Sequence, residues 1–258
     1  MHVDNTQQGI PSWVELMTSD EDAAVRFYGD LFNWVDNAQD VPGENGGTYH
    51  LATLGGDNIA GIGTERQPGV PPHWSIYFAV DDAVAVAAKV PAAGGQVIVP
   101  PTDVMNLGRM AIVADPTGAP IGLWEAKLHK GFGRRDEPGS VSWCELLTDD
   151  AAQATAFFTN ILGVPAEEMA MQGYSYTLLG PTVGRGAGIM SKTPEMGSMP
   201  TMWGVYFEVA DTDATVAKAR DLGATVLNEP QDMMAGRWAM LADPQGAVFG
   251  IIKSAPMP

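Results

Sequence analysis

The sequence predicts an α+β protein that arose by tandem duplication, with each half built from two βαβββ units. Three repeated segments support this prediction. Trp13-Val14-Glu15-Leu16 recurs as Trp143-Cys144-Glu145-Leu146, at an offset of 130 residues. The segment 74–78 recurs as 203–207 at an offset of 129, and 115–119 recurs as 243–247 at an offset of 128. An offset that changes so little is the signature of a duplication in which both copies keep the same core positions.

The first expected unit begins with a strand over residues 12–18, in which Trp13, Glu15 and Met17 share one face. Asp20 has the position of a helix N-cap. Apolar residues follow at helical spacing and predict a helix that covers the other strand face and ends near residue 33: Ala24, Phe27, Tyr28 and Leu31. Residues 49–54 and 59–63 flank a Gly-Gly-Asp-Asn turn, so they complete the unit as a hairpin.

The second unit starts at residue 74 with a strand over 74–80, an alanine-rich helix over 82–93 and a strand at 97–99. A hairpin with arms at 110–114 and 121–125 closes it, because the intervening Asp-Pro-Thr-Gly has the proline and glycine of a type I turn. The second copy is expected to run through strands at 174–179 and 203–209, a helix at 213–222 and its own closing hairpin. We therefore expect domains at 8–128 and 139–255, joined by a polar linker at 129–138.

Composition narrows the class of protein. The 258 residues include 14 basic and 31 acidic side chains, for a formal net charge of −17, and both halves are acidic. This charge repels phosphate backbones and anionic lipids, so we expect no nucleic-acid or membrane partner. The single cysteine, Cys144, excludes an intrachain disulfide and favours a reducing compartment. Because the first residues lack a leader pattern and no long apolar segment is present, the sequence predicts a cytoplasmic protein.

Two motifs and their copies cover nearly the whole chain. One is Asp20-x-x-x-Ala24-x-x-Phe27-Tyr28-x-x-Leu31, repeated from Asp150 to Leu162, and the other is the Asp-Pro-x-Gly-Ala turn. In this order and spacing they resemble the vicinal oxygen chelate superfamily, which includes glyoxalase I, extradiol dioxygenases and bleomycin-resistance proteins. The chain most resembles two-domain actinobacterial members, some of which occur among antibiotic-biosynthesis enzymes. The resemblance implies that each domain is a cup-shaped mixed sheet with its helices outside.

Metalloenzymes of this superfamily take a His or Gln from the first strand, a His from the fifth and a Glu from the eighth, because a divalent ion needs convergent N and O ligands. The resemblance places these positions on poor ligands: Trp13, Ser75, Gly122, Trp143, Gly204 and Gly250. All four histidines precede residue 130. We therefore expect no metal cofactor. The alternative is one divalent metal at a displaced site formed by Glu15, His50 and His73.

Without a metal, aromatic and apolar side chains would line the two cups. The candidate ligand-binding residues are Trp13, Met17, Tyr77, Trp124, Trp143, Met202, Tyr206, Glu208, Arg109 and Arg237. Aromatic walls favour planar ligands, and glycines on the strands are expected to leave room for a ligand. Trp74 and Trp203 point to the helix side by alternation and are expected in the core. Trp13 and Trp143 fit either a pocket wall or a plug of the cup.

Glu15 and Glu145 are the candidate catalytic residues, because a glutamate in an apolar strand is costly to bury unless it is paired or protonated. Each fits a general base or a hydrogen-bond anchor for a ligand hydroxyl or amine. Each also fits a structural ion pair with the arginine of its own copy, Arg109 or Arg237. The sequence leaves both interpretations open.

The function these patterns favour is metal-independent binding of an aromatic or polyketide-like natural product, for resistance, carriage or assistance to a tailoring enzyme. The alternative is a lyase, isomerase, hydroxylase or dioxygenase of the same superfamily, either cofactor-free through a pocket glutamate or with a displaced metal. A third possibility is a structural protein whose cups are filled by their own side chains. We expect the C-terminal cup to bind, since Gly204 and Ile252 replace Ser75 and Trp124 there. Because two domains in one chain supply the pairing that one-domain relatives reach by dimerising, we expect a monomer.

Overall fold

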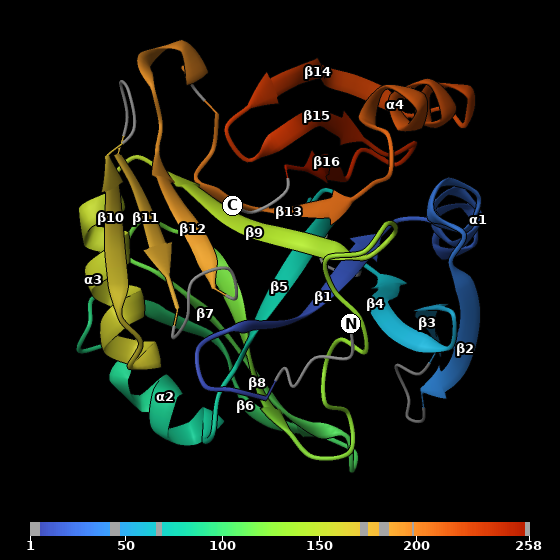
Figure 1. Cartoon of the computed structure of the whole chain (residues 1–258). Helices are drawn as coiled ribbons and strands as arrows, with labels where there is room; N and C mark the ends of the chain where they lie inside the picture. Colours follow the sequence, from blue (N-terminus) through green and yellow to red (C-terminus); the bar gives the residue numbers. More distant parts are fainter. Residues whose placement is uncertain are drawn as a thin grey trace.

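Two mixed sheets of eight strands form the protein (Figure 1). The computed structural model describes residues 6–41, 47–65, 69–170, 175–180, 186–197 and 199–255. The N-terminal sheet has the strand order β2-β3-β4-β1-β5-β8-β7-β6, and the C-terminal sheet repeats it as β10-β11-β12-β9-β13-β16-β15-β14. The predicted duplication of paired βαβββ units is therefore confirmed.

The element bounds follow the two copies in turn. The N-terminal copy contains β1 (Pro11–Thr18), α1 (Glu21–Phe32), β2 (Val35–Val41), β3 (Gly47–Leu54), β4 (Asp57–Thr64), β5 (His73–Ala79), α2 (Ala83–Lys89), β6 (Gln96–Val104), β7 (Gly108–Ala114) and β8 (Pro120–Ala126). The C-terminal copy contains β9 (Val141–Thr148), α3 (Ala151–Leu162), β10 (Ala166–Ala170), β11 (Ser175–Leu179), β12 (Ala187–Ser191), the 3-10 helix η1 (Pro194–Met196), β13 (Met202–Glu208), α4 (Thr212–Asp221), β14 (Thr225–Met233), β15 (Gly236–Ala242) and β16 (Val248–Ser254).

The repeated motifs occupy equivalent places. Asp20 and Asp150 cap α1 and α3, and each carboxylate accepts a hydrogen bond from a first-turn backbone N–H. Gly118 and Gly246 close the same turn in the two copies. The start of one expected strand, residue 174, lies outside the described residues.

The helix-covered faces of the two sheets pack against each other through aromatic rings. Phe207 of β13 lies 5.2 Å from the ring of Trp74 and 5.1 Å from that of Phe32, between centroids. In the pseudosymmetric contact, Trp203 lies 5.3 Å from Phe78. Trp74 and Trp203 are buried, as their alternation predicts. Helices α1 and α4 pair across this interface, as do α2 and α3 (Figure 1).

The opposite face of each sheet, which we call the cup face, turns away from this interface. The C-terminal sheet visibly curls from β10 round to β14 (Figure 1). Alternation along β1 places Trp13, Glu15 and Met17 on the N-terminal cup face. Within the described ranges, no helix is long and apolar enough to cross a membrane.

Candidate functional site

A carboxylate held by two tyrosines lies in the N-terminal cup. Glu15 on β1 accepts a hydrogen bond from the Tyr77 hydroxyl on β5, with 2.8 Å between the oxygens, and another from Tyr49 on β3. The Tyr49 hydroxyl accepts a hydrogen bond from Trp13 Nε1 at 3.3 Å. Burial raises the pKa of Glu15, and the two tyrosine hydrogen bonds oppose that shift.

The C-terminal cup repeats this cluster with one looser contact. Trp143 Nε1 donates to the Tyr176 hydroxyl at 2.8 Å, and Tyr176 is hydrogen-bonded to Glu145. The Tyr206 hydroxyl lies 3.4 Å from Glu145 Oε1, a long hydrogen bond compared with its N-terminal counterpart. Burial raises the pKa of Glu145, and it raises the pKa of Tyr206 well above 10, so that this hydroxyl keeps its proton.

Tyr49 and Tyr176 were not among the predicted site residues. Each opens the repeated pattern Tyr-x-Leu of the third strand of its copy, and the ring of each lies against a glycine of the neighbouring strand, Gly61 or Gly188. A Cβ on Gly61 would lie 1.9 Å from the Tyr49 hydroxyl, and one on Gly188 would lie 2.2 Å from that of Tyr176. The repeated tyrosine and glycine pair is the signal that could have found them.

The glycines at the former chelate positions accommodate tyrosine rings. A Cβ on Gly122 would lie 2.0 Å from Tyr77, and one on Gly250 would lie 2.2 Å from Tyr206. The expectation that these two glycines leave room for a ligand is therefore wrong. Gly204 differs, because its nearest neighbours would stand 3.8 Å from an added Cβ.

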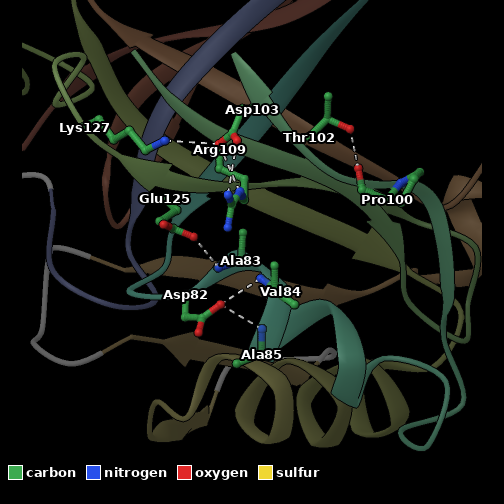
Figure 2. A network of polar contacts seen from close by, with 10 residues as sticks. All are labelled: Asp82, Ala83, Val84, Ala85, Pro100, Thr102, Asp103, Arg109, Glu125 and Lys127. Carbon is green, nitrogen blue, oxygen red and sulfur yellow. Dashed lines mark hydrogen bonds and ion pairs between the residues drawn. The ribbon is translucent and has the colours of Figure 1, made fainter. Parts of the chain in front are cut away.

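The ion pair between Glu15 and Arg109, one of the two interpretations that the sequence left open, does not form. Met110 pairs with Trp124 on the cup face, so the adjacent Arg109 points to the helix side of the sheet. There its guanidinium contacts Asp103 at 3.1 Å, beside the N-terminus of α2 (Figure 2). The arginine is therefore placed outside the cup.

The corresponding pair in the second copy, Glu145 with Arg237, does not form either. Arg237 lies on the helix side and contacts Asp213 on α4 and Asp232 on β14. The carboxylate of Glu208, a candidate ligand-binding residue, accepts hydrogen bonds from Ser142 and Ser254. Burial, rather than a second carboxylate, raises the pKa of Glu145.

Access distinguishes the two cups. In the N-terminal cup Trp13, Tyr77 and Trp124 are 5%, 8% and 7% exposed. The chain that follows β8 covers these rings: the His129 ring lies 4.4 Å from that of Trp13, and the Phe132 ring lies 5.8 Å from it. Burial lowers the pKa of His129 to about 4, so the imidazole is neutral at physiological pH. Three aromatic rings of the first cup, those of Trp13, Tyr77 and Trp124, are therefore covered, whereas Tyr49 stays partly exposed.

The C-terminal cup keeps its aromatic wall accessible. Trp143, Tyr206 and Trp238 are partly exposed, together with Met202. Trp238 pairs with Ile252 across β15 and β16, where the first copy has Met110 paired with Trp124. Trp238 on the neighbouring strand thus replaces the tryptophan that the last strand lacks, and it was not among the predicted ligand-binding residues.

The side chains present do not fit the divalent metal that the superfamily implies. The Tyr77 ring lies against Gly122 at one former ligand position. His50 pairs in register with buried Ile62 on the helix side of the sheet and contacts Asp36 at 2.9 Å, so it points away from Glu15. Among the described residues, no three His, Cys, Asp or Glu side chains converge as ligands. The displaced site of Glu15, His50 and His73 is therefore contradicted by geometry.

Elemental analysis of purified, untagged protein is expected to find divalent metals far below one ion per chain, because these positions supply neither N nor O ligands in a convergent set. Near-stoichiometric zinc, nickel, manganese or iron that survives dialysis would contradict this expectation. A variant in which His50 is replaced by alanine serves as control, since it should leave the metal content unchanged.

Fold and repeated cups define a class. A profile of the Glyoxalase/Bleomycin resistance protein/Dioxygenase superfamily matches residues 10–123 and 140–251, so the chain belongs to that superfamily. This confirms the resemblance drawn from the two motifs.

Particular relatives are similar over nearly their full length. The chain is 44% identical over 255 residues to "Putative glyoxylase CFP32" of Mycobacterium tuberculosis, covering 97% of each. It is 36% identical over 261 residues to "Anthracycline biosynthesis protein DnrV" of Streptomyces peucetius, covering 95% of this chain and 93% of that protein.

Two solved structures show the same fold. The Mn(II)-bound glyoxalase from Novosphingobium aromaticivorans has a TM-score of 0.64 at 17% identity and covers 95% of this chain and 82% of its own. The 2,2',3-trihydroxybiphenyl 1,2-dioxygenase from Sphingomonas wittichii has a TM-score of 0.65 at 17% identity, with 96% and 91% covered.

Proposed function

We propose that this protein binds an aromatic or polyketide-like small molecule in its C-terminal cup, without a metal ion. The observation that carries the proposal is the partly exposed aromatic wall of Trp143, Tyr206 and Trp238 around one half-buried carboxylate, that of Glu145. Planar ligands gain from stacking on such walls, and a few fixed polar groups orient them. The name of the relative DnrV, from anthracycline biosynthesis, supports a natural-product context.

In this proposal the N-terminal cup has a structural role and binds no ligand. Its own rings and those of His129 and Phe132 fill the place that a stacked ligand would take. A binding protein of this kind needs only one open cup, which fits resistance, carriage or assistance to a tailoring enzyme.

Replacing Trp143 with alanine is expected to weaken binding of planar phenols or quinones at least tenfold, because it removes a stacking wall and the donor to Tyr176, together worth about 2–4 kcal/mol. Titration of the remaining tryptophan fluorescence, with Trp238 as reporter in the cup, measures the effect. Isothermal calorimetry on the same ligands gives the dissociation constant independently.

The matched control is Trp13→Ala, the same change in the covered cup. It should lower stability without changing affinity. If Trp13→Ala weakened binding and Trp143→Ala did not, the N-terminal cup would be the binding site and the proposal would be wrong.

A further inference from the structure

The two glutamate clusters have the same members and differ in one contact. In the N-terminal cup the Tyr77 hydroxyl is 2.8 Å from Glu15, whereas in the C-terminal cup the Tyr206 hydroxyl is 3.4 Å from Glu145. The tight version lies among the buried rings of Trp13, Tyr77 and Trp124, where it joins β1 to β5. The loose version leaves a proton donor and a carboxylate side by side in the cup with the accessible aromatic wall.

The spacing of these two groups matches one piece of ligand chemistry. The oxygen of a ketone and the carbon next to its carbonyl group are ~2.4 Å apart, from ordinary C=O and C–C bond lengths. A hydroxyl and a carboxylate oxygen 3.4 Å apart can therefore meet the two atoms together, the hydroxyl at the oxygen and the carboxylate at the C–H. A base and an oxyanion donor held in this way are what proton abstraction beside a carbonyl requires.

We propose that the C-terminal cup catalyses cofactor-free proton transfer at a carbon adjacent to the carbonyl of a bound aromatic ketone, with Glu145 as base and Tyr206 as donor to the carbonyl oxygen. The proposal rests on the proposed function, since the same cup must first bind the ligand. The C–H bond breaks and its proton forms an O–H bond with Glu145. The electron pair stays in the ligand as an enolate, whose oxygen accepts the Tyr206 hydrogen bond. Return of the proton to the same or a conjugated carbon completes an exchange or an isomerisation without net oxidation.

Tyr176 and Trp143 act as positioning residues in this scheme. Trp143 Nε1 donates a hydrogen bond to the Tyr176 hydroxyl. That hydroxyl is in turn hydrogen-bonded to Glu145 and holds the carboxylate in place. The Tyr176 hydrogen bond also lowers the pKa of Glu145, against the rise that burial causes. Since the carboxylate is the base, the rate should increase as pH rises through the pKa of Glu145. Tyr176→Phe should move that inflection to higher pH.

The test is hydrogen–deuterium exchange of 2-tetralone in D₂O, followed by proton NMR at millimolar ketone, with binding measured by tryptophan fluorescence. Wild-type protein should exchange the protons next to the carbonyl faster than buffer does. Glu145→Gln should slow the protein-dependent rate about 100-fold or more, and Tyr206→Phe about tenfold or more, while both still bind. Glu15→Gln, the same change in the covered cup, should leave the rate unchanged.

Two results would overturn the proposal: equal exchange in wild type and Glu145→Gln, or no wild-type exchange above buffer. In the second case fluorescence separates the two claims. If the ketone binds but does not exchange, the proposed catalysis is wrong and the proposed binding function stands. If it neither binds nor exchanges, both proposals are wrong for this class of ketone. Circular dichroism melting of each variant shows that any loss does not come from unfolding.

Discussion

Tyr28→Phe is expected to lower the free energy of unfolding by about 1–3 kcal/mol, although it removes a single oxygen atom. The Tyr28 hydroxyl donates to Asp243 Oδ2 of the other domain at 3.0 Å and accepts from Trp74 Nε1 at 3.2 Å. All three residues are buried, so the substitution leaves a buried donor and a buried carboxylate oxygen without that partner. Urea denaturation followed by tryptophan fluorescence measures the change.

The reciprocal variant Phe158→Tyr tests the same chain of hydrogen bonds in the other copy. There Trp203 Nε1 is buried without a partner, because Phe158 occupies the place of the tyrosine. The added hydroxyl should supply an acceptor and leave stability equal or higher by about 0.5–1.5 kcal/mol. If Tyr28→Phe proved neutral and Phe158→Tyr strongly destabilising, these hydrogen bonds would contribute nothing to the free energy of unfolding. Packing alone would then determine the stability of the interface.

Gly122→Ala is expected to destabilise the N-terminal domain by roughly 1–3 kcal/mol, because overpacking forces a ring or a strand to move. The new Cβ would lie 2.0 Å from Cδ1 of Tyr77, whose hydroxyl is fixed on Glu15. The melting temperature should fall in differential scanning calorimetry.

Gly204→Ala is the matched control on the cup face. Its Cβ would meet its nearest atoms at 3.8 Å, an ordinary contact, so stability should stay close to that of the wild type. Equal melting temperatures for Gly122→Ala and wild type would show that the tyrosine ring moves aside freely and that the cup adapts.

The duplication could be predicted from the sequence because it depends on the spacing between repeated segments, which can be read directly from the sequence. Core tryptophans such as Trp74 and Trp203 followed from alternation, since strand period alone decides which face a residue takes. The edge strand β2 could not be predicted from its residues, because Val35–Val41 is exposed along its length and carries no apolar period.

The candidate site was predicted only in part. Both glutamates were placed on the cup face, but an ion pair with an arginine was one of the two interpretations left open, because opposite charges suggested pairing. The register of β7 and β8 decides otherwise, since it sets Arg109 on the helix side. His129 and Phe132 cover the first cup because the chain after β8 folds back over it. The Gly- and Arg-rich sequence of this linker does not indicate that path.

The hydrogen bond from Tyr28 to Asp243 has no counterpart in the other copy, where Phe158 stands at the position of Tyr28. In a symmetric homodimer every substitution occurs twice, so an interface cannot hold a tyrosine at one of its two equivalent positions and a phenylalanine at the other. Fusion of two copies into one chain removes that constraint, and Tyr28 with Phe158 records the departure from symmetry. After the fusion, side chains could fill one cup without the same substitutions occurring in the other cup.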